Sequence, residues 1–347
     1  MLLLETFDQI SETMASKNIP LFDNAFLELP FPLPIITIQK FIPRFRQLTE
    51  DIVQITSTIH ALEIPFQIPL APGKSIARSV HLYLVLGDPI TLIDSGVAGA
   101  HQIVFDCLRE NGRRPEEIAT LILTHAHPDH IGSARTIRGL TGCRVLAHAL
   151  EKEWIEDTER QKEARPVPGF DVLVEGPVLV DELLADGQTL DLNPETRCQV
   201  YATPGHSPGS LSLLFAREKV LITGDALPLP GDLPIYDDLA LALRSIGTVR
   251  DLAQQADTLL SSWEAPIHGQ ERIRQRIADA VSWLRRIHET VLRIHQHQQT
   301  TGIELCTVVV RELGLPPFAA NPLVARSLLS SLAVAGQPDL FVQWEQA

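Results

Sequence analysis

The segment Thr124-His125-Ala126-His127-Pro128-Asp129-His130-Ile131-Gly132 places three histidines and an aspartate within six positions. It follows residues 118–123, a short apolar run of the kind that forms a buried strand. The histidines therefore lie where a strand ends and a loop begins. Imidazole and carboxylate groups are the usual ligands of divalent metals such as zinc. A histidine-rich surface loop is the alternative, but such a loop has no reason to follow a buried strand. The segment predicts a metal site.

Other strand-like segments end in a similar way. One ends in Asp94-Ser95-Gly96, a second in Thr203-Pro204-Gly205-His206, and a third in Thr223-Gly224-Asp225. Ligands collect at strand ends because a rigid sheet fixes their positions. A further histidine stands in Pro266-Ile267-His268-Gly269. Two divalent ions, with one carboxylate between them, could share the metal-capable side chains of these segments: His125, His127, Asp129, His130, His206, Asp225 and His268.

Three regions are predicted along the chain. Residues 1–55 form an N-terminal extension broken by prolines, with one amphipathic helix indicated by the spacing of apolar residues over 3–14. This extension could pack on the main domain or on a partner subunit, or act as a lid. Residues 56–270 form the catalytic domain, in which 236–262 reads as one helix. Residues 271–347 read as a helical or winged-helix-like region.

Composition narrows the classes of protein. Of the 347 residues 45% are hydrophobic, which predicts a sizeable core, and the formal net charge is −14. This charge disfavours a broad nucleic-acid or membrane-binding surface but leaves room for a local basic patch, for which the arginines at 272–293 are candidates. The four cysteines form no C-x-x-C pair, and the start lacks a basic signal-peptide region. We expect a cytoplasmic protein without a membrane span, and leave a homodimer open.

The motifs together resemble those of the metallo-β-lactamase-fold hydrolases. The resemblance covers about residues 56–270 and rests on D-S-G at Asp94, H-x-H-x-D-H at 125–130, T-P-G-H at His206, T-G-D at Asp225 and a final histidine. It implies an α+β fold, an αββα four-layer sandwich with metals at one edge of its sheets. Asp225 is typical of the glyoxalase II, lactonase and RNase Z-like branches, because class B β-lactamases typically have a cysteine at that position.

The resemblance also implies a role for each site residue. His125, His127 and His206 would hold the first metal, Asp129, His130 and His268 the second, and Asp225 would bridge the two. Asp94 would support the site through hydrogen bonds without being a ligand. The approach to His268 departs from the family, which usually has a glycine just before this histidine. The second metal would be loosely bound if His268 were not a ligand.

The expected reaction is hydrolysis. Two ions, most simply Zn²⁺ although iron or manganese suits the same donors, would provide a metal-bound hydroxide that attacks a small ester, thioester or lactone. Asp129 would orient the nucleophile and take part in proton transfer. Two other functions stay open at this stage: a nuclease for single-stranded RNA or DNA, and a metal-binding regulatory protein with residual hydrolysis.

Overall fold

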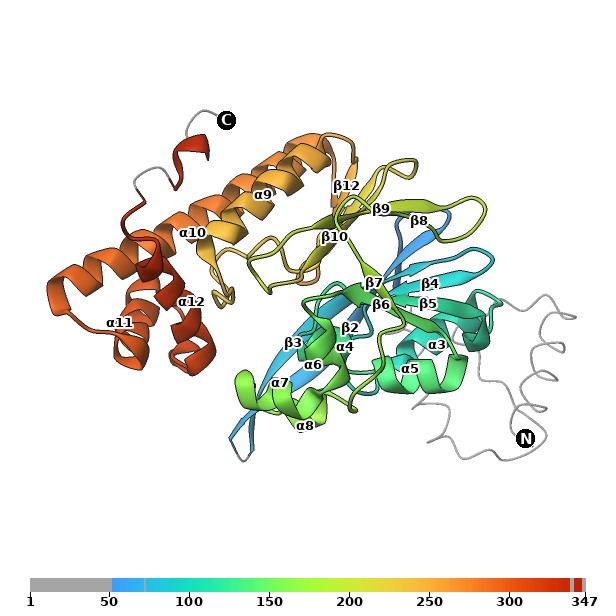
Figure 1. Cartoon of the computed structure of the whole chain (residues 1–347), viewed down its shortest axis with the longest axis horizontal. Coiled ribbons are helices and arrows are strands. Elements are labelled where there is room, and N and C mark those ends of the chain that lie inside the picture. The colour runs from blue at the N-terminus through green and yellow to red at the C-terminus, as the bar shows by residue number, and fades with distance from the viewer. Residues whose placement is uncertain (1–51, 72, 338–339, 345–347) are drawn as a thin grey trace, which may run out of the picture. The chain divides into compact units, whose positions relative to one another are not determined.

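The computed structural model describes residues 52–71, 73–337 and 340–344 (Figure 1). The helix predicted over residues 3–14 lies outside this part of the chain, as does nearly all of the predicted extension. All of the described residues belong to one compact unit. The first sheet has seven strands in the order β1-β2-β3-β4-β5-β6-β7. They are β1 (Ile52–Gln54), β2 (Ile59–Ala71), β3 (Lys74–Val85), β4 (Ile90–Ile93), β5 (Ile118–Ile122), β6 (Arg144–His148) and β7 (Glu182–Leu184).

The second sheet has six strands in the order β13-β12-β11-β10-β9-β8. They are β8 (Thr189–Asp191), β9 (Arg197–Ala202), β10 (Leu211–Phe215), β11 (Val220–Ile222), β12 (Thr258–Leu260) and β13 (Ile267–His268). Every residue of β10, β11 and β12 is buried, which is the pattern of strands covered on both faces. Strands β11 and β12 run parallel, so their carboxyl ends meet at the same edge.

Three apolar clusters define four layers. One cluster fills the space between the two sheets. A second lies between the first sheet and the helices on its outer face: α3 (His101–Glu110), α4 (Pro128–Ile131), α5 (Ala134–Thr141), α6 (Lys152–Glu156) and α8 (Phe170–Leu173). The short segments η1 (Pro115–Glu117) and α7 (Thr158–Ala164) adjoin these helices. The third cluster lies beneath α9 (Leu239–Ala253) and α10 (Gln270–Gln298) on the second sheet. This arrangement confirms the αββα sandwich (Figure 1).

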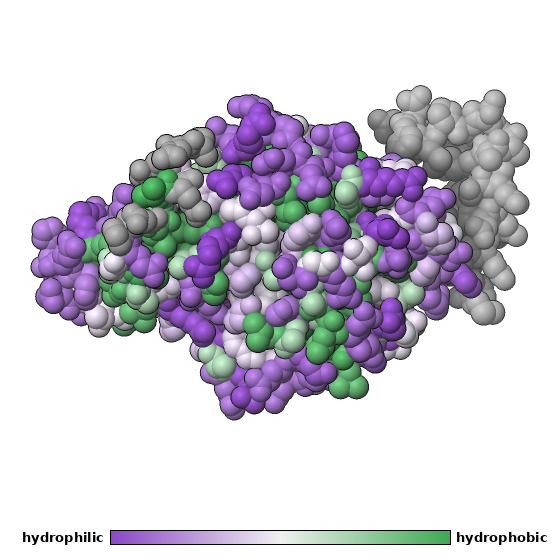
Figure 2. All heavy atoms as spheres, turned by 45° about the horizontal axis from the view of Figure 1, so that its top comes forward, coloured by the Kyte–Doolittle hydropathy of each residue, from purple (hydrophilic) through white to green (hydrophobic). Residues whose placement is uncertain are grey.

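The third cluster continues into the C-terminal region. Residues 302–344 contribute α11 (Gly302–Leu313), η2 (Pro317–Ala319), α12 (Pro322–Ala333) and η3 (Val342–Trp344). The described residues beyond α10 contain helices and no strand, so the region is helical and lacks the β-wing of a winged helix. The face turned forward in Figure 2 is mostly hydrophilic, with hydrophobic residues in small separate patches. Within the described ranges, no helix combines the length and apolar character that a membrane crossing requires.

One predicted element differs from the structure. The helix predicted over 236–262 is instead helix α9 followed by strand β12. The apolar residues of α9 have helical spacing, but Leu259 and Leu260 belong to a buried run that is too short to show a period. This error hides a strand end beside the predicted metal site.

Candidate metal centre

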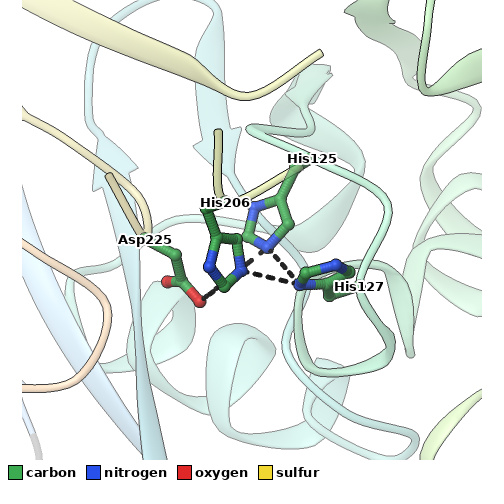
Figure 3. A group of neighbouring side chains, drawn as sticks. All are labelled: His125, His127, His206 and Asp225. Atoms are coloured by element: carbon green, nitrogen blue, oxygen red, sulfur yellow. Dashed lines mark hydrogen bonds and ion pairs between the residues drawn. The ribbon is translucent and has the colours of Figure 1, made fainter. Parts of the chain in front are cut away.

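Loops at the carboxyl ends of three strands bring the predicted ligands together. His125 to His130 follow β5, His206 follows β9 and Asp225 follows β11. The side chains of His125, His127, His206 and Asp225 point toward one another in Figure 3. One ligand atom from each lies within 4.8 Å of all the others, and Asp129, His130 and Asp225 form a second such group. Six of the seven predicted ligands are therefore neighbours, and Asp225 belongs to both groups.

The first group has the spacing of a tetrahedral site. The Nδ1 atom of His127 is 3.0 Å from Nε2 of His125 and 2.7 Å from Nε2 of His206. Asp225 Oδ2 lies 3.2 Å from Nε2 of His206 and 3.8 Å from Nε2 of His125. Ligands at about 2.0–2.1 Å from a tetrahedral zinc ion are about 3.3 Å apart, within the range of these separations.

The outer hydrogen bonds of the histidines fix which nitrogen faces inward with a lone pair. Nδ1 of His206 is 2.8 Å from the carbonyl oxygen of Ile235, which can only accept, so Nδ1 carries the proton. Nδ1 of His125 is 3.1 Å from Oγ1 of Thr124, whose hydroxyl donates to Asp94, so this Nδ1 also carries a proton. Both Nε2 atoms therefore present lone pairs to His127. One N–H of His127 cannot satisfy both, and a cation between the rings would satisfy all three.

The second group consists of buried atoms without hydrogen-bond partners. These are Asp129 Oδ2, His130 Nε2 and Asp225 Oδ1. His130 Nε2 is 3.5 Å from the Asp129 oxygen and 3.4 Å from the Asp225 oxygen. Buried polar atoms normally have partners, so three convergent ones fit a bound ion. The donor set therefore suits a divalent metal at both positions.

Asp94 lies behind the ligands, where its predicted supporting role requires it. Its Oδ1 accepts the backbone N–H of Thr124 at 2.7 Å, and its Oδ2 accepts the Thr124 hydroxyl at 2.8 Å. Oδ2 is also 2.9 Å from Nδ1 of His130, so this ring donates through Nδ1 and turns Nε2 inward. Asp94 has φ of 60°, a left-handed conformation that a short polar residue tolerates.

Burial and mutual charge set the pKa values in the cluster. Burial lowers the pKa of His125 and of His127 well below their usual value, and the neighbouring positive charge of His130 adds to this at His125 and that of Arg165 at His127. Burial alone would raise the pKa of Asp225, but the adjacent His130 and His206 hold it well below the usual range. Burial also opposes protonation of His130, yet three surrounding carboxylates raise its pKa well above normal. Asp129 has a pKa raised by burial.

Glu151 is a site residue that the sequence predictions missed. It is 1% exposed and connects the two ligand loops. Its Oε2 accepts the N–H of Ala126 at 2.8 Å, while Oε1 accepts the Ser207 hydroxyl at 2.8 Å and the Gly209 N–H at 2.6 Å. Glu151 comes shortly after the carboxyl end of β6, so the strand-end pattern applied to this strand would have pointed to it.

The structure does not bring His268 to the centre, which corrects the predicted ligand set. His268 is exposed and pairs with Thr258, the first residue of β12, with its Nδ1 3.0 Å from the Thr258 hydroxyl. Asp225 follows β11, whose last residue Ile222 pairs with Leu260 at the other end of β12. The side chain that does reach the centre from β12 is Trp263, whose Nε1–H donates to Asp225 Oδ2 at 2.8 Å.

The fold and the site together define a metal-binding αββα protein with a histidine- and aspartate-lined sheet edge. The model of the metallo-beta-lactamase superfamily matches residues 76–271, more than half of the chain, and the chain belongs to this superfamily. Its relatives include several probable metallo-hydrolases, and the chain is a metal-dependent hydrolase.

Two relatives and one solved structure illustrate the similarity. The chain is 31% identical over 161 residues to the probable metallo-hydrolase YqgX of Bacillus subtilis, covering 46% of this chain and 70% of that protein. It is 30% identical over 158 residues to a hydroxyacylglutathione hydrolase of Methylobacterium nodulans, covering 44% of this chain and half of that enzyme. A metallo-beta-lactamase family protein of Thermus thermophilus aligns with a TM-score of 0.62 at 25% identity, over 79% of this chain and 94% of that one.

Proposed function

We propose that the protein is a dinuclear-metal hydrolase of a small ester, thioester or lactone. The observation that carries the proposal is the position of Asp225. One of its oxygens faces Nε2 of His206 and the other faces Nε2 of His130, so a single carboxylate joins the two convergent groups of ligand atoms. Such sharing is the arrangement that two-metal hydrolytic sites use.

The donor set favours zinc as the resident metal. The first position offers three imidazole nitrogens and one carboxylate oxygen, all common zinc ligands. Iron and manganese suit the same donor types and are the alternatives. When bound, the ions supply Lewis acidity that makes a water nucleophilic at neutral pH.

The protein's own side chains orient the nucleophile, carry a proton and hold the ligand loops in place. Asp129 lies at the second position with an unpaired oxygen and a pKa raised by burial, so it is suited to orient the nucleophile and to carry a proton. Glu151 and Asp94 hold the ligand loops from behind. His206 and Asp129 are the more accessible members of the cluster, because their side chains are 11% and 15% exposed. We infer that the substrate approaches from this side.

Two observations support a small acyl substrate over a nucleic acid. The relatives named hydroxyacylglutathione hydrolase favour an acyl compound, with a thioester as the first choice. The arginines that could have formed a basic face on α10 are partly neutralised, since Arg274 pairs with Glu271, Arg276 with Glu264 and Arg293 with Glu312. The nuclease alternative is therefore not favoured.

A screen of thioesters, lactones and phosphodiesters on protein of known metal content tests the proposal. We expect turnover of an acyl substrate at saturating zinc, with two ions bound per chain. His206→Ala and Asp225→Ala should lose bound metal and lower kcat/KM by more than about a hundredfold, because each removes a ligand. His295→Ala is the control, since its ring bonds the carbonyl oxygen of Thr300, just beyond the C-terminal end of α10. Protein that holds two ions and hydrolyses none of these substrates would contradict the proposal.

A further inference from the structure

We infer that Trp263 occupies the place of a metal ligand and makes the two metal positions unequal, with one ion held tightly and the other weakly. The inference rests on the two-position centre of the proposed function. It concerns affinity, however, and is tested without measuring hydrolysis. The first position has four protein donors, three of them imidazole nitrogens, whereas the second has three donors, one of which is shared.

The position of Trp263 follows from strand β12. This strand is parallel to β11, so the residues after its last residue Leu260 emerge beside Asp225. Those residues are Ser261, Ser262 and Trp263. The carboxyl ends of β5, β9 and β11 each deliver metal-capable side chains to the centre, while β12 delivers an indole. An indole N–H is a donor only and cannot bind a cation through its nitrogen.

Three interactions hold the segment after β12 on strand β3. The Ser261 carbonyl accepts the hydroxyl of Tyr83 at 2.9 Å, and the Ser262 carbonyl accepts the N–H of His81 at 2.8 Å. The guanidinium of Arg78 stacks 4.5 Å above the ring of Trp263. The indole is therefore fixed beside Asp225.

A salt bridge in turn holds the guanidinium of Arg78. Its two terminal nitrogens donate to the Asp232 carboxylate at 3.0 and 2.6 Å. Asp232 belongs to the loop that follows Asp225. The contacts from Asp232 to Arg78, from Arg78 to Trp263 and from Trp263 to Asp225 therefore link both ends of this loop to strand β3 and to the indole. Through these contacts the indole N–H restrains Asp225 in the orientation that both positions share. Trp263 is thus a positioning residue that adds no ligand.

Donor number and charge predict the difference in affinity. A second divalent cation lies about 3.5–4 Å from the first in such sites and experiences its repulsion. Among the described residues, the donors at the second position that oppose that repulsion are Asp129, His130 and one oxygen of Asp225. We expect the second ion to dissociate at concentrations at least about a hundredfold above the first, and a fourth donor to reduce that ratio by about tenfold or more.

Titration of metal-free protein with Zn²⁺, followed by equilibrium dialysis and elemental analysis, measures both affinities. W263H places an imidazole where the indole N–H now lies and should narrow the ratio of the two dissociation constants by at least about tenfold. W263F removes the N–H without adding a donor and should not narrow it. Near-equal affinities in the native protein, an unchanged ratio in a folded W263H protein, or a narrowed ratio in W263F would each overturn the inference.

Fluorescence gives a second readout that does not depend on activity. Co²⁺ at the first position would share the Asp225 oxygen to which the indole donates, so the first equivalent should quench Trp263. W263F should abolish this step. W344F is the matched control. Trp344 stacks on Arg250 in the last turn of α9, so its replacement should leave the quenching intact. Quenching that persists in W263F would place the first ion away from the indole and contradict the proposed contact.

Discussion

At the scale of single residues, the site depends on which ring nitrogen of each histidine carries the proton. Asp94 illustrates this, because its carboxylate accepts from Thr124 and from Nδ1 of His130 and so leaves Nε2 of His130 facing the second position. It does so from a left-handed backbone conformation, with φ of 60°. Such conformations persist where surrounding structure fixes them, which is common at functional sites.

The same environments predict how acid affects the metal-free protein. His125 and His127 have pKa values lowered by burial, so near pH 6.5 the unfolded chain binds protons that the folded chain does not. Their contribution to the free energy of unfolding is complete above pH 6.5 and decreases as the pH falls below it. The decrease is at most about 1.4 kcal/mol per pH unit for each histidine.

Two groups with raised pKa values change the free energy of unfolding in the opposite sense, but they do not cancel its decrease below pH 6.5. His130, with a raised pKa, is protonated in both states below pH 6.5 and no longer contributes to the slope. Asp129, with a raised pKa, accounts for at most one proton, fewer than the two histidines. Urea unfolding midpoints in chelator should therefore fall between pH 6.5 and pH 5, and a flat series would contradict this. H288Q, which removes a histidine outside the cluster, should keep most of the slope.

At the scale of elements, the pattern of strand ends shows what could be predicted from sequence. His125, His206 and Asp225 each follow an apolar strand, and a glycine directly precedes the last two, so their convergence was predictable. Strand β12 was not, because its three residues carry no detectable period and follow a helix of similar composition. Once β12 is taken as helix, the register that places Trp263 beside Asp225 and His268 at the opposite end is lost. The pairing of β12 with β11 and β13, which are distant in sequence from the ligand loop after β5, decides which side chain reaches the centre.

Glu151 offers a test of how one element aligns two others. Its carboxylate accepts N–H and O–H donors from the loops that carry His127 and His206. Glu151→Gln keeps the size but turns amide hydrogens toward these donors, so one hydrogen bond is lost and a buried donor is left unpaired. We expect about 10–100-fold weaker zinc binding, measured by competition with a chelator. Glu156→Gln is the control, since the partners of Glu156, the N–H of Val180 and the ammonium of Lys152, lie outside the ligand loops. Unchanged affinity in Glu151→Gln would exclude this positioning role.

At the scale of the whole molecule, the C-terminal helices are continuous with the core beside the metal centre. The predicted boundary between residues 270 and 271 falls at the start of α10, and one apolar cluster extends from β10 and β11 through α10 to α12. Helix α12 also reaches the loop before α9. The hydroxyl of Ser327 accepts the N–H of Tyr236 at 2.9 Å, and that of Ser330 accepts the N–H of Leu239 at 2.7 Å.

This contact predicts that α12 influences a metal ligand. The loop that α12 holds includes Ile235, whose carbonyl accepts Nδ1–H of His206. Replacing both Ser327 and Ser330 with alanine leaves two backbone N–H groups without acceptors, at a cost of about 1–3 kcal/mol each. We expect a lower melting temperature and, because Ile235 loses its support, weaker zinc binding at His206. Thr307→Ala is the control, because its hydroxyl donates to the carbonyl oxygen of Ile303 within α11. If the double variant lost stability but kept its zinc affinity, the C-terminal helices would support the fold without setting the geometry of the centre.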